Sequence, residues 1–119
     1  MKLLGDVQYF GLKKSWQSDY YTEISFSLDE VKSTDYNKIE DISERATFIS
    51  RRQGYKYILK DERKSLERKV YQSKNLKNRI ELDYNYNKGL LNVFIKGEDA
   101  EEILTSLEKL LQKEEKQAA

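Results

Sequence analysis

The chain contains no histidine, no cysteine and no proline. Without histidine or cysteine it cannot build a Ser-His-Asp or Cys-His catalytic group, a disulfide, or a zinc site with imidazole or thiolate ligands. Without proline it has no rigid hinge and no proline-rich linker, and no domain boundary is evident. Its 5 glycines form none of the glycine-rich motifs that cradle phosphates. These absences exclude several common classes of enzyme.

Long apolar runs are also absent. Residues 1–6 lack the apolar stretch of a signal peptide, and nothing in the chain approaches the roughly 18 apolar residues of a membrane span. We therefore expect a soluble, intracellular protein in the cytoplasm, with no membrane partner. The 119 residues are enough for one domain that buries about two-thirds of its unfolded surface. We expect a single domain over residues 1–119, with a charged tail that frays at about 113–119.

A β-hairpin is predicted in the second half of the chain. In residues 79–86 and again in 90–96, apolar and polar side chains alternate, which is the period of a half-buried strand. Residues 87–89 lie between these segments and end in Gly89, which can take the left-handed conformation of a short hairpin loop. We predict strands over 79–86 and 90–96 joined by a tight turn.

An amphipathic helix is predicted after the hairpin. Asp99 is a good N-cap residue, and Glu102 follows three residues later, as in a capping box. Isoleucines and leucines then recur at spacings of three and four, which gives the helix one apolar face. We predict a helix over 99–114 that covers the sheet, with Leu107 and Leu110 buried.

The first half of the chain predicts further strands and one helix. Residues 7–12 and 20–28 read as strands, residues 35–52 as a helix and residues 55–59 as a short strand. Residues 61–78 fit a helix or a strand equally well. The predicted fold class is α+β, with an antiparallel sheet of about four to six strands, a C-terminal amphipathic helix packed on it and one helix in the first half.

The formal net charge of +1 conceals a strong segregation of charge along the chain. Segment 51–79 holds eleven basic residues against three acidic ones, a sum of +8. Segments 19–50 and 98–119 sum to −5 and −4. A nearly neutral protein can therefore present a strongly basic surface, provided that the fold gathers these bases on one side.

Segment 51–79 carries the main functional hypothesis. Lysine and arginine neutralise phosphates and aromatic rings stack on unpaired bases, which favours a non-enzymatic nucleic-acid-binding protein. The expected contact residues are Arg51, Arg52, Tyr55, Lys56, Tyr57, Lys60, Lys64, Arg68, Lys69, Tyr71, Lys74 and Lys77. The choice between DNA and RNA stays open, as does neutralisation of these bases by segments 19–50 or 98–119. An ordinary solvated charged surface is the structural alternative.

The 9 tyrosines support a second hypothesis. Tyrosine is enriched at protein interfaces because it joins apolar area to a polar tip, and it is also an ordinary strand residue. We expect Tyr84 and Tyr86 in the core. We expect an edge or a contact surface for Trp16, Tyr20, Tyr21, Tyr36, Tyr55 and Tyr57. The alternative function is a protein–protein interaction or assembly subunit, and the pattern is compatible with a homodimer.

The C-terminal pattern of strand, turn, strand and helix, with the run IKGED from Ile95 to Asp99, resembles the end of the small dimerising subunit of the KEOPS tRNA-modification complex. The resemblance covers about a quarter of the chain, and the pattern is common among α+β domains. It implies a link to RNA-related assemblies. It carries no residue role over to this chain.

A metal-dependent nuclease is the third and weakest hypothesis. The runs Glu62–Lys64 and Glu67–Lys69 each contain Glu-x-Lys, half of a nuclease-type metal site, and a further carboxylate could come from Asp41, Glu44 or Asp61. Such short motifs arise often by chance in a chain that is 36% charged. We therefore expect no catalytic residue, no metal and no cofactor.

Overall fold

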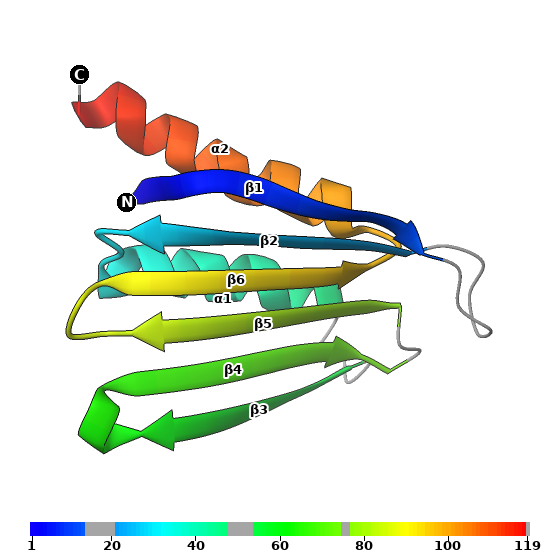
Figure 1. The fold of residues 1–119 in the computed structure, drawn as a ribbon, viewed down its shortest axis with the longest axis horizontal. Coiled ribbons are helices and arrows are strands. Elements are labelled where there is room, and N and C mark those ends of the chain that lie inside the picture. Colours follow the sequence, from blue (N-terminus) through cyan, green and yellow to red (C-terminus); the bar gives the residue numbers. More distant parts are fainter. Residues whose placement is uncertain (14–20, 48–53, 75–76, 119) are drawn as a thin grey trace.

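Six strands form one antiparallel sheet, and two helices lie on the same face of it (Figure 1). The computed structural model describes residues 1–13, 21–47, 54–74 and 77–118, with their side chains except at 11–13, 21 and 113–118. The α+β class is confirmed, together with a sheet of the expected size, a C-terminal helix packed on it and one helix in the first half.

The elements follow one another as β1 (Lys2–Lys13), β2 (Tyr21–Asp29), α1 (Ser33–Thr47), β3 (Gly54–Asp61), β4 (Leu66–Ser73), β5 (Asn78–Asn85), β6 (Leu90–Gly97) and α2 (Ala100–Ala118). A single 3-10 turn, Glu62–Lys64, joins β3 to β4. Neither of the two helices described is both long and apolar enough to cross a bilayer.

The strand order in the sheet is β1-β2-β6-β5-β4-β3. β1 and β2 form a hairpin, α1 then crosses the sheet, and β3 to β6 return by successive hairpins until β6 pairs with β2. This last pairing places Ile24 opposite Ile95 and Phe26 opposite Val93, all of them buried. The two edge strands, β1 and β3, therefore lie at opposite sides of the sheet (Figure 1).

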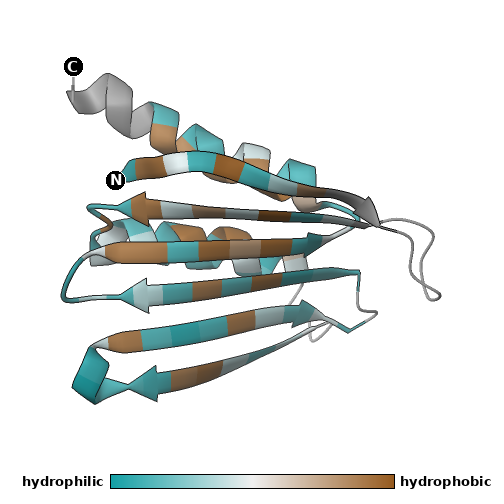
Figure 2. Cartoon of the chain, in the orientation of Figure 1, coloured by the Kyte–Doolittle hydropathy of each residue, from teal (hydrophilic) through white to brown (hydrophobic). Residues whose placement is uncertain are grey.

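The hydrophobic core lies between the sheet and the helices. α1 packs on β4 and β5, and α2 packs on β2 and β6. Apolar and polar residues alternate along the strands, so that one face joins the core and the other stays open (Figure 2). Leu107 is buried as predicted, and Leu110 is half-buried. The largest fully buried apolar side chains are Tyr71, Ile24, Leu28, Ile39, Ile80, Leu82, Leu91, Ile95, Val70 and Val93.

The start of α2 is fixed by a reciprocal pair of hydrogen bonds. The Asp99 backbone N–H donates to Asn78 Oδ1 at 3.1 Å, and Asn78 Nδ2 donates to Asp99 Oδ2 at 3.0 Å. In a capping box, the side chain of Glu102 would accept the hydrogen bond from the Asp99 backbone N–H; here Asn78 accepts it instead. Gly97 permits this close approach, because its φ is +143° and a Cβ there would lie 2.2 Å from the Lys77 carbonyl oxygen.

Several element boundaries differ from those predicted. Residues 61–78, for which the sequence left helix and strand open, contain a short 3-10 turn and then β4. The first-half helix begins at Ser33, and the part of its predicted range after Thr47 lies outside the described residues. β1 begins at Lys2, five residues earlier than predicted.

Two predictions about tyrosines were wrong. Tyr86 is exposed rather than buried, because β5 ends at Asn85 and the alternation does not continue beyond it. Tyr36 was expected at a contact surface but is buried in the core, where its ring stacks on that of Tyr84 with 4.4 Å between the ring centroids.

Candidate interaction surface

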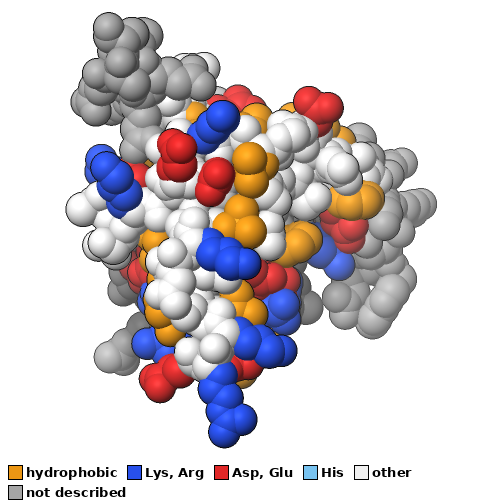
Figure 3. Space-filling view, turned by 60° about the vertical axis from the view of Figure 1, so that its left-hand side comes forward, with side chains coloured by type: hydrophobic (Ala, Val, Ile, Leu, Met, Phe, Trp, Pro, Cys, Tyr) orange, Lys and Arg blue, Asp and Glu red, His pale blue; other side chains and the backbone are white. Residues whose placement is uncertain are grey.

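The strands divide the basic segment between two faces and two ends of the sheet. Because successive residues of a strand point to opposite faces, charges that are adjacent in sequence separate in space. On the open face are Arg68 and Arg79; on the helix-covered face are Lys56, Lys60 and Lys69; at the two ends of these strands are Arg63, Lys64, Lys74 and Lys77. Figure 3 accordingly shows acidic side chains among the basic ones.

On the helix-covered face, acidic residues of α1 neutralise Lys56 and Lys69. Lys56 Nζ lies 3.4 Å from Glu44 Oε1. Lys69 forms an ion pair with Glu40 of α1 and another with Glu67, the latter at 2.9 Å. Burial lowers the pKa of Lys69, but its hydrogen bonds to the two glutamates outweigh that effect and raise the pKa above its usual value. The charges of both lysines are thus neutralised by ion pairs within the protein.

On the open face, each arginine of the basic segment has an acidic neighbour. The Arg68 guanidinium forms a two-point contact with Asp83, at 2.6 and 3.1 Å, and this contact raises the pKa of Arg68. Arg79 lies 3.5 Å from Glu81. A phosphate that approached either arginine would compete with a carboxylate that already neutralises its charge.

Further pairs continue this neutralisation. Lys60 lies 3.6 Å from Glu67, and Lys77 lies 3.2 Å from Asp99. The hydrogen bond from Asn78 and the ion pair with Lys77 lower the pKa of Asp99. Segments 19–50 and 98–119 therefore both supply acidic partners to the basic segment, which was left open by the sequence.

Three bases of the segment, Arg63, Lys64 and Lys74, have no ion pair within 4.0 Å among the described residues and are exposed. Arg51 and Arg52, which were also expected to contact nucleic acid, lie outside the described residues. The free positive charge of the described part of segment 51–79 is thus confined to the two ends of the strands.

The tyrosines of the basic segment also separate. Tyr55 and Tyr57 are exposed, as predicted, with 50% and 42% of their surface accessible. Tyr71 is fully buried beneath α1, with an exposed fraction of 0%, so its ring cannot stack on a base in this structure. The side chains of Trp16, Tyr20 and Tyr21 lie outside the described set.

Edge strand β3 exposes large apolar side chains on both of its faces. Ile58 and Leu59, which are 48% and 57% exposed, follow Tyr57 directly and therefore point to opposite faces. Sequence reasoning missed Ile58 and Leu59 as contact residues. The available signal was the run of three large apolar residues from Tyr57 to Leu59, which breaks the alternation of a half-buried strand. We call Tyr55, Tyr57, Ile58 and Leu59 the β3 patch. β3 is the last strand of the sheet, and no described strand pairs with its outer edge.

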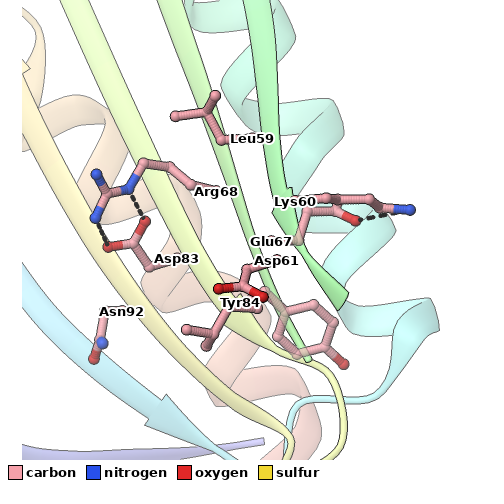
Figure 4. A pocket seen from close by; sticks show the side chains of 9 residues that line it. Leu59, Lys60, Asp61, Glu67, Arg68, Asp83, Tyr84 and Asn92 are labelled. Atoms are coloured by element: carbon pink, nitrogen blue, oxygen red, sulfur yellow. Dashed lines mark hydrogen bonds and ion pairs between the residues drawn. The ribbon is translucent and has the colours of Figure 1, made fainter. Parts of the chain in front are cut away.

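A hollow of about 360 Å³ lies beside the β3 patch (Figure 4). Leu59 and Leu66 contribute apolar area to its lining, and the Arg68–Asp83 ion pair also lines it. The other lining residues are Lys60, Asp61, Glu67, Tyr84 and Asn92. Arg68 is paired with Asp83 and Lys60 with Glu67, whereas Asp61 has no ion pair among the described residues. The hollow therefore offers two leucine side chains and one carboxylate to a partner.

The opposite edge of the sheet is irregular. The register of β1 with β2 shifts after Leu4 and again after Tyr9, and Gly5 has a left-handed φ of +67°. Such irregularities are how natural sheets prevent edge-to-edge pairing. β3, in contrast, keeps one register with β4 from Gly54 to Asp61. β1 also exposes apolar side chains, namely Leu3, Leu4, Tyr9 and Phe10.

The residues of the nuclease hypothesis do not form one cluster. Glu62 and Lys64 lie in the turn after β3, whereas Glu67 and Lys69 belong to the ion pairs beneath α1. Among the described residues, no group of three or more His, Cys, Asp or Glu side chains is placed to hold a metal ion. The nuclease hypothesis stays a prediction from the sequence.

The fold and the surface together define a two-layer α+β domain with one open sheet face and one regular apolar edge. Comparison with protein families, with curated proteins and with solved structures finds no match for this chain. The function is therefore argued from the chemistry of the surface.

Proposed function

We propose that the protein is a non-enzymatic protein-interaction module, a subunit of a larger assembly, which binds its partner through the β3 patch. The observation that carries this proposal is the exposure of four large apolar side chains on both faces of the edge strand that keeps a regular register with its neighbour. Aromatic and aliphatic side chains at the centre of an interface supply most of its binding energy.

The backbone of β3 supports the same reading. An edge strand presents a row of unpaired N–H and C=O groups, to which an extended segment of a partner can add as a further strand. Lysines commonly protect such edges, but Lys56 and Lys60 both turn to the helix-covered face and pair with Glu44 and Glu67. The unbroken register with β4 keeps the outer hydrogen-bonding groups of β3 in the regular pattern of an antiparallel strand.

The test of this function compares two exposed positions on the same sheet. Leu59→Lys places a charge in the β3 patch, and Phe94→Lys places the same charge on the open face of central strand β6, where Phe94 is 44% exposed. The tagged chain and both variants are used to isolate a partner from the native host, and the purified partner is then titrated against each of them.

We expect Leu59→Lys to weaken the partner's affinity at least tenfold and Phe94→Lys to leave it within about threefold. Equal affinity for the two variants would contradict the proposal. Circular dichroism of both variants checks that the fold is intact.

Single-stranded nucleic acid is a second candidate ligand. The exposed rings of Tyr55 and Tyr57 favour it, because they lie on the strand that leads into the turn with the unpaired cations Arg63 and Lys64. Fluorescence anisotropy with labelled single- and double-stranded DNA and RNA, at about 50 mM salt, tests it. Binding through this turn predicts that Arg63→Ala with Lys64→Ala lowers the salt slope of log K by up to about 1.4 for a single strand. No binding at high micromolar protein would exclude this candidate.

A further inference from the structure

We infer that the occupant of the β3 patch is a second copy of this chain, paired antiparallel through β3, with Ile58 on the two-fold axis. This inference rests on the proposed function and names its partner. Two-fold contacts are the commonest way in which identical chains associate, and they require a surface that is complementary to itself.

The sequence of β3 has this self-complementary pattern. Ile58 is flanked by the apolar residues Tyr57 and Leu59, and these in turn by Lys56 and Lys60, so the order of residue types is the same in both directions. In a two-fold antiparallel contact centred on Ile58, each Ile58 faces the other. Tyr57 then faces Leu59 of the second copy, and by symmetry Leu59 faces Tyr57 of the second copy.

Neighbouring registers are less favourable. A two-fold axis perpendicular to the sheet keeps the open faces of both copies on one side, so residues that face each other must share a face. If the axis moves to Tyr57, Ile58 faces Lys56 of the second copy. If it moves to Leu59, Ile58 faces Lys60 of the second copy. Only the register centred on Ile58 sets apolar residues against apolar residues at all three central positions.

The charges at the junction do not oppose this register. Lys56 faces Lys60 of the second copy, but within each chain Lys56 is paired with Glu44 and Lys60 with Glu67. The helix-covered side of the junction therefore brings together equal numbers of lysines and glutamates. On the open side, Tyr55 faces Asp61 of the second copy, which places a phenol hydroxyl donor near a carboxylate.

The size of the patch sets the expected strength. Four side chains that are each about half exposed offer on the order of 300 Å² per copy, which with the backbone gives an interface below about 1,200 Å² in total. Interfaces of that size are weak and reversible. We expect a dimer with a dissociation constant on the order of 10 μM, populated as the protein concentration rises.

The absence of cysteine makes the register directly measurable. Facing residues of antiparallel strands have Cβ atoms about 4.5–5.5 Å apart, close enough to form a disulfide after a small adjustment, whereas diagonal neighbours are about 7–8 Å apart. Ile58→Cys alone should form a disulfide-linked dimer under mild oxidation. Tyr57→Cys alone and Leu59→Cys alone should not, but an equimolar mixture of the two should form the mixed dimer.

Phe94→Cys is the control for random collision, since it places an equally exposed thiol away from the edge. Sedimentation equilibrium of the unmodified chain and of Ile58→Lys provides the second readout, and Ile58→Lys should weaken dimerisation at least tenfold. A cross-link of Ile58→Cys no faster than that of Phe94→Cys, together with a monomer at 200 μM (about twentyfold above the expected dissociation constant), would overturn self-pairing.

That result leaves the proposed function standing if Leu59→Lys still abolishes binding of a different protein. If no affinity depends on Leu59 and the chain is monomeric, both proposals are wrong.

Discussion

Tyr36 and Tyr84 show how two buried phenol groups in contact can contribute with opposite sign. Their rings are stacked, with 24° between the ring planes. The Tyr84 hydroxyl donates to the Val31 carbonyl oxygen at 2.7 Å, whereas the Tyr36 hydroxyl has no hydrogen-bond partner among the described residues. A buried hydroxyl without a partner loses its hydration and gains nothing in exchange.

We expect Tyr36→Phe to raise the free energy of unfolding by about 1 kcal/mol, and Tyr84→Phe to lower it by about 1 kcal/mol. The ring stacking is kept in both variants, so the difference reports the hydroxyl groups alone. Urea unfolding followed by circular dichroism gives both values. A loss of stability in Tyr36→Phe as large as that in Tyr84→Phe would show that the Tyr36 hydroxyl has a bonding partner.

Adjacent positions of β4 give a second residue-scale contrast. Lys69→Met leaves Glu40 and Glu67, whose side chains are 16% and 13% exposed, without their common cation, and we expect it to cost about 3 kcal/mol. Arg68→Met breaks the exposed pair with Asp83 on the other face and should cost less than about 1 kcal/mol. Equal losses of unfolding free energy in the two variants would contradict the assignment of faces.

At the scale of elements, the sequence predicted those strands and helices whose apolar periodicity and end residues are local in the chain. The β5–β6 hairpin and α2 have uninterrupted periods of two and of three to four, with a turn glycine and an N-cap residue at their ends. All three elements form where the sequence predicted them, with ends that differ by one residue in the strands and by up to four in α2. β4 could not be assigned, because its helix-covered face carries charged residues that become compatible with burial only when α1 supplies glutamates. The cap of α2 was misattributed because Asn78 is 21 residues away in the chain from Asp99.

The same limit applies to the candidate surface. A sum of charge over 51–79 assumes that all of its bases lie on one surface. Strand alternation and pairing instead distribute these bases over both faces of the sheet. The exposure of Tyr55 and Tyr57 was predictable from their strand, but the edge position of β3 depends on the pairing of β2 with β6, which no local signal specifies.

The packing of α2 can be tested at one position. Leu107→Ala should lower the free energy of unfolding by about 2–5 kcal/mol, because it removes a buried side chain between α2 and the sheet. Thr105→Ala, an exposed position of the same helix, should change it by less than about 0.5 kcal/mol. Chemical unfolding of both variants measures the difference, and a small effect of Leu107→Ala would mean that α2 is not packed as described.

For the molecule as a whole, the buried tyrosines predict the response to alkaline pH. Burial raises the pKa of Tyr36, Tyr71 and Tyr84 above the usual value near 10, with nearby carboxylates adding to the shift. The unfolded chain then releases these protons at lower pH than the folded protein does. Stability is therefore fully present below about pH 10 and is lost as the pH rises further.

Urea unfolding at several pH values between about 8 and 11 should show this decline, and Tyr36→Phe should make it shallower because one of the groups is removed. A decline of equal steepness in the variant and in the unmodified chain would contradict the contribution of Tyr36.

The irregular first strand has a consequence for stoichiometry. Each copy contributes a six-stranded sheet with one straight edge and one bulged edge. Joining the two straight edges leaves a bulged β1 at both ends of the combined sheet, where donors and acceptors are unevenly spaced and a further chain finds no template. In the proposed dimer, growth would therefore stop at two copies, whereas the same apolar edge on a chain with two straight edge strands would allow a fibre to form.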